Sequence, residues 1–170
     1  GKIDLQSKVN EGTYFSVSVP LKIDRDVSGE KSDSTVRPTV DMHRKMALLV
    51  EDNELNMEIA EFLLEGEGMI VVKASNGKEA VEKFAASEVG GFDIIFMDVM
   101  MPVMNGLDAA RKIRSMTRAD AQTIPVIAMT ANAFQDDVQR SFEAGMNVHI
   151  TKPLDINKIR EAITDVMTKK

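Results

Sequence analysis

Short apolar runs alternate with longer segments of helical periodicity along most of this chain, and this alternation limits the possible folds more than any other feature. The runs predict strands over 45–50, 69–73, 92–97, 125–129 and 148–150. The segments between and after them predict helices over 54–65, 77–87, 106–117, 135–144 and 155–168. Repeated strand–helix units form parallel sheets with right-handed crossovers. We therefore expect an α/β fold, a doubly wound five-stranded parallel sheet with helices on both faces.

The first 24 residues follow a different pattern, in which apolar and polar residues alternate with the period of a strand. The pattern predicts an antiparallel β-hairpin with a turn at Asn10-Glu11-Gly12, where glycine can adopt a positive φ. Residues 25–44 are rich in Ser and charged residues, so they cannot bury enough apolar surface to offset their ordering entropy. We therefore divide the chain into a hairpin (1–24), a linker (25–44) and an α/β domain (45–170).

Charge and composition exclude several classes of function. The 170 residues include 21 Lys and Arg against 27 Asp and Glu, and a net charge of −6 argues against a protein that coats nucleic-acid phosphates. The absence of Cys excludes disulfides, thiolate zinc sites and thiol nucleophiles. No apolar run is long enough to span a membrane, and the start has neither an initiator Met nor a signal-peptide layout. We expect an intracellular piece of a longer protein, without direct membrane contact.

Polar residues follow four of the predicted strands where each strand ends. Ligands of such folds bind beyond the carboxyl ends of the strands, so these side chains should lie at one edge of the sheet. A single Asp after a strand is most often a turn former, but an accidental match at four strands is much less probable. Clustered carboxylates repel one another unless they share a cation, and hard oxygen ligands suit Mg²⁺. The residues are Glu51 and Asp52, Asp98, Thr130, and Lys152.

A carboxylate beside a metal ion can attack phosphorus and form an acyl phosphate. Thr130 and Lys152 would then hold the oxygens of the incoming phosphoryl group, one by a hydrogen bond and the other as a point charge. The edge of the sheet therefore predicts a Mg²⁺-dependent phosphoryl-accepting site.

Four segments closely resemble the response-regulator receiver domain. They are Val50-Glu51-Asp52-Asn53, the stretch Asp98-Val99-Met100-Met101-Pro102-Val103-Met104-Asn105-Gly106, Thr130-Ala131, and Lys152-Pro153. The resemblance covers residues 45–170 and implies the flavodoxin-like strand order 2-1-3-4-5.

The resemblance also implies a role for each matching residue. Asp98 is expected to be the phospho-acceptor, and Asp52 the main acidic ligand of Mg²⁺ with help from Glu51. The backbone carbonyl of Met100 is expected to complete the metal site. Thr130 matches the switch hydroxyl of the family and Lys152 its phosphate-contacting lysine. The Lys152–Pro153 bond is of the kind that is cis in the family.

One position departs from the receiver pattern. The family often has an aromatic residue three positions before the lysine, and this chain has His149 there. A histidine can move in and out as an aromatic ring does, but it is smaller and can carry a charge. His149 is therefore a candidate switch residue, and an exposed histidine at the end of a strand is the alternative.

The hairpin resembles the last two strands of a histidine-kinase ATP-binding domain, through Gly1-Lys2-Ile3 and the stretch from Glu11 to Leu21 that contains Gly-Thr-Tyr-Phe. A hybrid sensor kinase has this order of domains, which implies a parent histidine kinase. The chain has no Asp-x-Gly-x-Gly motif, and neither His43 nor His149 is followed by the acidic residue and proline of a phospho-accepting helix. We expect this piece to catalyse only its own phosphoryl uptake and loss.

The same resemblances imply the partner and the compartment. The phosphoryl group should come from a phosphohistidine, carried by the dimerisation and phosphotransfer domain of a kinase or by a histidine phosphotransfer protein. No nucleic acid is expected to bind. The chain is expected in the cytoplasm, whether or not its parent kinase is anchored to a membrane.

Two alternatives belong to other functional classes. A small phosphatase or phosphotransferase with an aspartyl-phosphate intermediate usually has a second acid two residues after the nucleophile, to protonate the leaving group. That position is Met100, which has no acid–base chemistry. A flavin carrier of the same fold would need a phosphate-binding loop after the first strand, where Glu51 and Asp52 would repel the flavin phosphate. The phosphorylation switch is therefore the favoured hypothesis.

Overall fold

The structure is a computed structural model that describes residues 1–8, 12–20, 40–131 and 135–168. The chain divides into two compact units, Gly1–Thr35 and Val36–Lys170, and each is described by itself. The middle of the predicted hairpin turn and most of the predicted linker lie outside the described residues. No helix among the described residues is long and apolar enough to cross a membrane.

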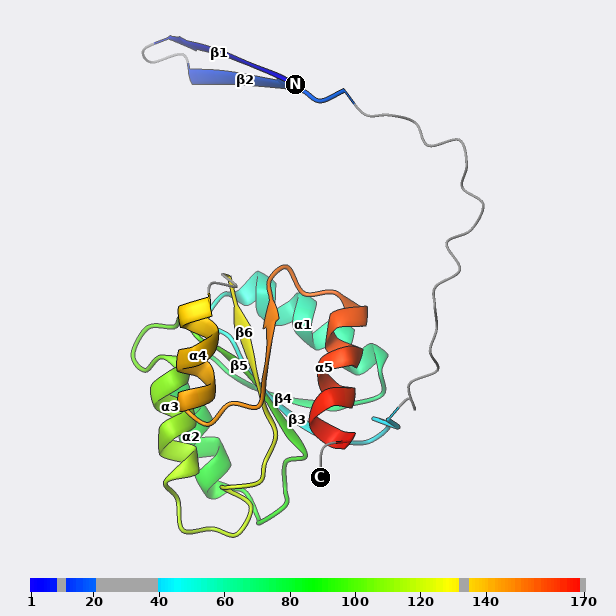
Figure 1. The fold of residues 1–170 in the computed structure, drawn as a ribbon, viewed down its shortest axis with the longest axis vertical. Helices are drawn as coiled ribbons and strands as arrows, with labels where there is room; N and C mark the ends of the chain where they lie inside the picture. The colour runs from blue at the N-terminus through cyan, green and yellow to red at the C-terminus, as the bar shows by residue number, and fades with distance from the viewer. Residues whose placement is uncertain (9–11, 21–39, 132–134, 169–170) are drawn as a thin grey trace. The chain divides into compact units, whose positions relative to one another are not determined.

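Within its described residues, the larger unit contains five parallel strands and five helices (Figure 1). The strands are β3 (Met46–Val50), β4 (Ile70–Ala74), β5 (Ile94–Asp98), β6 (Val126–Thr130) and β7 (Val148–Thr151). The helices are α1 (Glu54–Gly66), α2 (Gly77–Ala86), α3 (Gly106–Arg114), α4 (Gln135–Glu143) and α5 (Ile156–Thr168). The predicted elements are all present, with ends that differ by a few residues at most.

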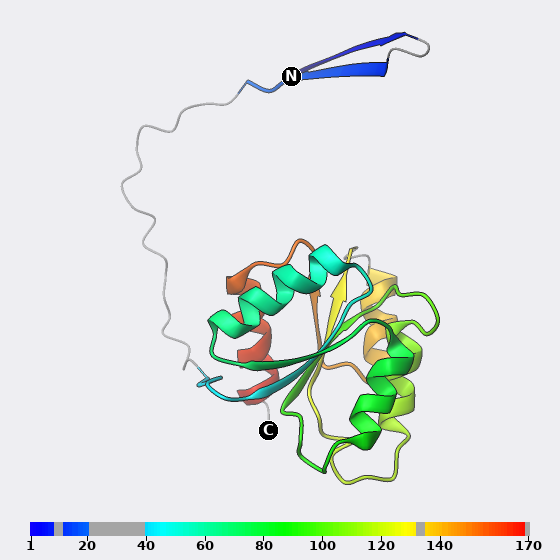
Figure 2. The same cartoon turned by 180° about the vertical axis from the view of Figure 1, so that it is seen from behind.

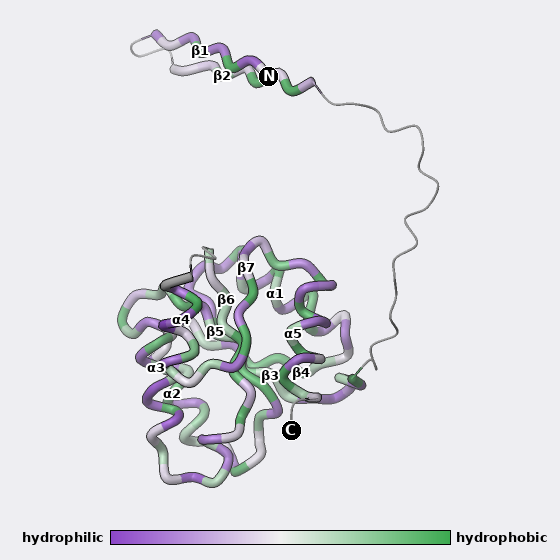
Figure 3. The backbone as a smooth tube through the Cα atoms, viewed as in Figure 1, coloured by the Kyte–Doolittle hydropathy of each residue, from purple (hydrophilic) through white to green (hydrophobic). Residues whose placement is uncertain are grey.

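The strands are ordered β4-β3-β5-β6-β7, which is the predicted order of a flavodoxin-like sheet, and the predicted fold class is confirmed. Helices α1 and α5 cover one face, and α2, α3 and α4 cover the other (Figures 1 and 2). Because both faces are covered, the central strands β3, β5 and β6 are apolar except for the last residues of β5 and β6, and Figure 3 shows them largely in the colour of hydrophobic residues.

Each face of the sheet has its own apolar core. On strand β3, Leu48 and Val50 pack towards α2 and α3, whereas Ala47 and Leu49 pack towards α1 and α5. The largest contributor from a helix is Phe84 of α2, which is fully buried. This alternation with period two fixes the register of the strands, because a slip of one residue would exchange the two cores.

Asparagine caps set the start of three helices at the edge where the strands end. The side-chain oxygens of Asn53, Asn76 and Asn105 accept the backbone N–H groups three residues later, at 3.1, 3.0 and 2.8 Å. These bonds satisfy amide groups that have no partner within the helix. Helices α1, α2 and α3 therefore begin close to the strand ends that carry the predicted site.

The sheet unit begins before residue 45. Met42 is buried in the core formed with α1 and α5, and Val40 packs against the same core. Residues 40–44 were predicted as the end of the linker, but their two apolar side chains find partners on this unit. The remaining domain division stays a prediction.

The smaller unit is the predicted antiparallel strand pair, β1 (Lys2–Lys8) with β2 (Gly12–Ser18). Ile3 lies opposite Val17, and Leu5 lies opposite Phe15, so these four side chains share one face of the pair. All four are more than half exposed. The apolar face predicted from the alternation is therefore present.

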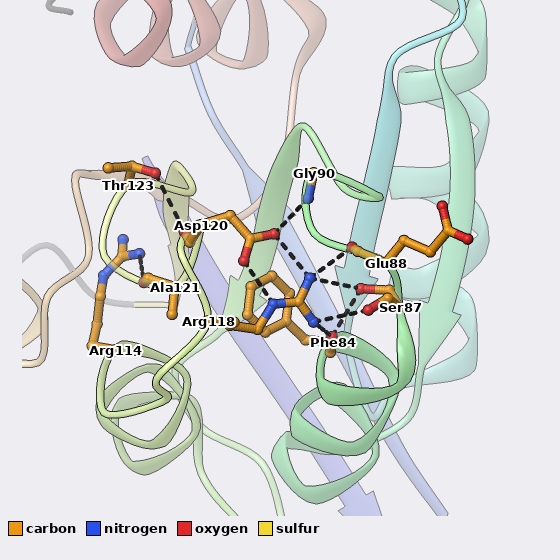
Figure 4. A network of polar contacts seen from close by, with 9 residues as sticks. All are labelled: Phe84, Ser87, Glu88, Gly90, Arg114, Arg118, Asp120, Ala121 and Thr123. Atoms are coloured by element: carbon orange, nitrogen blue, oxygen red, sulfur yellow. Dashed lines mark hydrogen bonds and ion pairs between the residues drawn. The ribbon is translucent and has the colours of Figure 1, made fainter.

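A cluster around Arg118 ties two loops together at the edge of the sheet where the strands begin (Figure 4). The Arg118 guanidinium makes paired bonds to Asp120, with Nε–Oδ1 at 2.6 Å and Nη2–Oδ2 at 2.9 Å. It also donates to the carbonyls of Phe84, Ser87 and Glu88 at the end of α2, and lies over the Phe84 ring at 4.2 Å. The cluster thereby joins the loop after α3 to the turn before β5.

Asp120 should stabilise the fold in a pH-dependent way. The Arg118 hydrogen bond lowers its pKa to about 2, from an ordinary value of 3.8. Such a carboxylate contributes stability that is fully present above its unfolded pKa and is lost as the pH falls towards the folded pKa. We predict that Asp120→Asn costs about 1–3 kcal/mol at neutral pH, as expected for a charge-assisted hydrogen bond.

Thermal unfolding from pH 7 to pH 2 would test this prediction. The gap in melting temperature between wild type and Asp120→Asn should stay constant down to about pH 5 and close between about pH 4 and 2. Glu82→Gln is the control, because Glu82 is exposed and lies 3.8 Å from Lys78. A gap that does not change with pH would contradict the role given to the Asp120 charge.

Candidate functional site

Asp98 is the last residue of β5, in the middle of the sheet, and only 4% of its surface is exposed. Its Oδ1 accepts the backbone N–H of Met100 at 3.0 Å. The loop that follows turns back so closely that a Cβ on Gly106 would overlap the carbonyl oxygen of Asp98. Gly106 is therefore required for α3 to begin beside the strand end.

Lys152 follows β7 and brings an ammonium group to the same place. Its Nζ lies 2.6 Å from Asp98 Oδ2 and 2.5 Å from Glu51 Oε2. The first contact is a hydrogen bond, and the second is an ion pair. The backbone N–H of Lys152 donates to the carbonyl of Thr130 at 2.8 Å, and the Lys152–Pro153 bond is cis.

Three carboxylates gather at this edge of the sheet. Glu51, Asp52 and Asp98 each present an oxygen within 4.8 Å of the others, with Glu51 and Asp98 buried and Asp52 exposed. A carboxylate cluster that is open to solvent on one side suits a hard cation such as Mg²⁺, which keeps several of its waters.

A buried oxygen gives an independent test of this fit. Glu51 Oε2 lies against the Lys152 ammonium at 2.5 Å, and no other donor among the described residues reaches it. Buried carboxylate oxygens ordinarily accept hydrogen bonds, and a water in the hydration shell of a cation would supply one. The three carboxylates, together with this oxygen that can accept one more hydrogen bond, therefore fit a hydrated divalent cation.

The charges of the site shift two pKa values. Burial raises the pKa of Asp98, and the Lys152 ammonium and the Met100 N–H only partly oppose it. Burial alone would lower the pKa of Lys152, but hydrogen bonding to Asp98 and Glu51 and the charges of these two carboxylates raise it. Lys152 therefore stays protonated, while the negative charge of Asp98 is destabilised by its surroundings.

Two candidate switch residues lie on the strands beyond β5. Thr130 ends β6 and is 93% buried, one position beyond the residue that pairs with Asp98. His149 is half-buried in β7, and its ring lies edge-on to Phe142 with centroids 6.4 Å apart. It is therefore not a freely exposed histidine at a strand end. The predicted switch roles of both residues stay predictions.

The arrangement joins a buried carboxylate, a lysine that contacts it, a carboxylate cluster and a hydroxyl, all on the carboxyl ends of parallel strands. Residues 47–164 match the response regulator receiver domain family. The chain belongs to this family. The matched residues lie within the sheet unit, and the hairpin lies outside the match.

Comparisons with individual proteins agree with the receiver assignment. The sensor histidine kinase AruS of Pseudomonas aeruginosa is 33% identical over 168 residues, which cover 99% of this chain and 16% of the kinase. AruS and seven other curated histidine kinases are far longer than this chain, which spans between 7% and 19% of their length. The predicted resemblance is confirmed, because the chain matches the receiver domains of homologous hybrid histidine kinases.

Two solved structures are similar in sequence as well as in fold. The receiver domain of a sensor histidine kinase from Pseudomonas aeruginosa, with a magnesium ion coordinated in its active-site cleft, is 33% identical with a TM-score of 0.65. The match covers 73% of this chain and 98% of that one.

The second structure is a co-crystal of a Saccharomyces cerevisiae histidine phosphotransfer protein with the receiver domain of its downstream response regulator. It is 28% identical with a TM-score of 0.64, and the match covers 76% of this chain and 94% of that one.

The receiver domain contains a site contact that the sequence analysis missed. Asn56, in the first turn of α1, donates from Nδ2 to Glu51 Oε1 at 3.0 Å. Its signal in the sequence is weak, because a polar residue in the first turn of a helix usually faces solvent. The role of Met100 was assigned to its carbonyl, and the structure shows its N–H bound to Asp98, while its side chain is 76% exposed.

The raised pKa of Asp98 leads to a prediction about stability without metal. Burial raises the pKa of Asp98, so its charge is net unfavourable, and the neutral Asp98→Asn should be more stable than wild type in EDTA at pH 7. Lys152 keeps its ion pair with Glu51 in this variant. Thermal unfolding should show a melting temperature above that of wild type.

The matched control for this prediction is Asp108→Asn, at an exposed aspartate that pairs with Arg111 on the surface of α3. The control should not raise the melting temperature. A lower melting temperature for Asp98→Asn would show that the Lys152 contact outweighs the cost of burial.

Proposed function

We propose that this receiver domain accepts a phosphoryl group from a phosphohistidine onto Asp98 in a Mg²⁺-dependent reaction and changes conformation in response. The observation that carries the proposal is the buried Asp98 carboxylate, held 2.6 Å from Lys152 beside two other carboxylates. The phosphatase alternative lacks its second acid, since the exposed side chain at position 100 is that of methionine.

Different residues of the site carry out the attack, bind the phosphoryl oxygens and bind the metal ion. An Asp98 oxygen attacks phosphorus, the bond from phosphorus to the donor imidazole nitrogen breaks, and its electron pair returns to the ring. Lys152 and Thr130 hold the oxygens of the transferred group. Asp52, Asp98 and the carbonyl of Met100 would hold Mg²⁺, with Glu51 acting through a water. When bound, the ion neutralises the carboxylates and polarises the phosphoryl oxygens.

Phosphoryl uptake from acetyl phosphate tests the acceptor and the metal together. Intact-mass spectrometry should show wild type gaining one phosphoryl group with Mg²⁺ and none in EDTA, while Asp98→Asn gains none in either condition. Asp52→Ala should need a higher Mg²⁺ concentration, and Glu51→Ala should be affected less. Full labelling of Asp98→Asn would place the acceptor elsewhere.

Helix α1 offers a surface for the phosphodonor next to the site. It begins just after Asp52, and its side chains Leu55, Ile59 and Phe62 are 65%, 45% and 77% exposed. Their spacing of four and three residues places them in one stripe along the helix.

A second stripe with the same spacing runs beside the apolar one. It is acidic, formed by the exposed Glu54, Glu58 and Glu65, and the helix contains no basic residue. Glu61 has the same spacing but is half-buried and paired with Lys73 of β4 at 2.9 Å. The two stripes together fit a partner helix with apolar residues flanked by Lys or Arg. A helical histidine domain of a kinase, or a histidine phosphotransfer protein like that of the yeast complex, is the proposed partner.

A protein phosphodonor and acetyl phosphate, used side by side, distinguish an effect on partner docking from an effect on phosphoryl transfer itself. Phe62→Glu should slow phosphoryl transfer from a protein donor about tenfold or more, because it places a charge on the most exposed side chain of the apolar stripe. Uptake from acetyl phosphate should not change. The donor is the fastest of a panel of phosphorylated histidine domains, and Val89→Glu, an exposed apolar site outside α1, is the control. Equal loss with both donors would contradict the docking role.

The parent protein and its compartment complete the proposal. We infer a hybrid histidine kinase as parent, with the hairpin as the end of its ATP-binding domain. Support comes from the AruS match, which extends over 99% of the chain and so includes the hairpin. A phosphohistidine formed with ATP is available in the cytoplasm, so we place the receiver there. Fractionation of cells that produce the full-length parent would test this location.

A further inference from the structure

Asn56 directs its side chain back from α1 towards the end of β3. The residue is half-buried, and its Nδ2 donates to Glu51 Oε1 at 3.0 Å. Its backbone N–H is already satisfied by the capping oxygen of Asn53 at 3.1 Å. The side chain is therefore not needed to start the helix, and Ala would be the better helix former at this position.

The two oxygens of Glu51 have different surroundings. Oε1 receives the Asn56 amide and, at 3.4 Å, the backbone N–H of Asn53. Oε2 lies 2.5 Å from the Lys152 ammonium, and no other donor among the described residues reaches it. The terminal torsion of a glutamate is soft, so the hydrogen bonds to Oε1 and the Lys152 contact with Oε2 together set the orientation of the carboxylate.

We propose that Asn56 is a positioning residue for the metal site, which holds the Glu51 carboxylate so that Oε2 faces Lys152 and a water of the bound cation. The inference rests on the proposed Mg²⁺-dependent function. Mg²⁺ keeps several of its waters and dehydrates reluctantly. A carboxylate outside the inner coordination shell can therefore contribute by accepting a hydrogen bond from such a water, and its orientation then affects metal affinity.

Loss of the Asn56 side chain leaves Oε1 with only the long contact from Asn53. A buried carboxylate oxygen without a good donor is unfavourable. The Glu51 carboxylate therefore turns, so that both of its oxygens contact the Lys152 ammonium. This movement removes the acceptor for the metal-bound water. It also draws the ammonium away from Asp98, from which it is separated by 2.6 Å.

A double-mutant cycle on Mg²⁺ affinity tests the inference, because Asn56 is argued to act only through Glu51. Calorimetric titration with MgCl₂ compares wild type, Asn56→Ala, Glu51→Ala and the double variant. We expect Asn56→Ala to bind Mg²⁺ about tenfold more weakly than wild type. In the Glu51→Ala background, the same substitution should change the affinity by less than about twofold.

The matched control is Asn157→Ala, in the first turn of α5. Asn157 is exposed, and its backbone N–H is likewise held by a capping side chain, that of Asp155. This control should leave Mg²⁺ affinity unchanged. Circular dichroism and melting temperature check that each variant is folded, and Asn56→Ser, whose side chain is too short to reach Glu51, repeats the test if Asn56→Ala does not fold.

The outcomes separate this inference from the proposed function. If wild type neither binds Mg²⁺ nor accepts a phosphoryl group, the proposed function fails and the role of Asn56 fails with it. If wild type does both, but Asn56→Ala binds Mg²⁺ as wild type does, the inference alone is overturned. Equal losses in the two backgrounds would also overturn it, because Asn56 would then act through a group other than Glu51.

Discussion

The contact of two buried carboxylates with one ammonium is the interaction on which the arrangement of the site depends. Glu51, Asp98 and Lys152 follow three different strands, and their charged groups meet because parallel strands end at the same edge of the sheet. Burial makes each charge costly alone, and the contact is favourable only as a group. The sheet order therefore determines the chemistry, since Lys152 could not reach Asp98 if β6 and β7 lay elsewhere.

Uncharged residues around the site hold its charged groups close together. Asparagine caps start α1, α2 and α3 beside the strand ends, and Gly106 lets the loop after Asp98 return without overlap. The Arg118 cluster joins loops at the opposite edge of the sheet, where no predicted site residue lies. The Arg118 cluster thus stabilises the end of the sheet opposite the destabilised charges, while the asparagine caps stabilise the helix starts beside them.

The sequence predicts the sheet and the strand-end residues well because both depend on local patterns. Five apolar runs of strand length fix the topology almost completely, and Asp98 and Lys152 follow from where those runs end. Side-chain contacts between different helices and strands are harder to predict from the sequence. The packing of Met42 on α1 and α5 depends on two apolar residues within a polar segment. The bond from Asn56 to Glu51 depends on a side-chain direction that periodicity does not encode.

The formal charge of the site explains why a cation and a phosphoryl group belong together there. Three carboxylates face one ammonium, so the ionised cluster carries two excess negative charges. A divalent cation cancels this excess, and only then can a dianionic phosphoryl group approach Asp98 without strong repulsion. Phosphorylation adds negative charge again, next to Lys152 and near the end of β6. The response of the receiver to phosphorylation should therefore begin with Thr130, at the end of β6, and Lys152, just after β7, whose backbones are joined by a hydrogen bond of 2.8 Å.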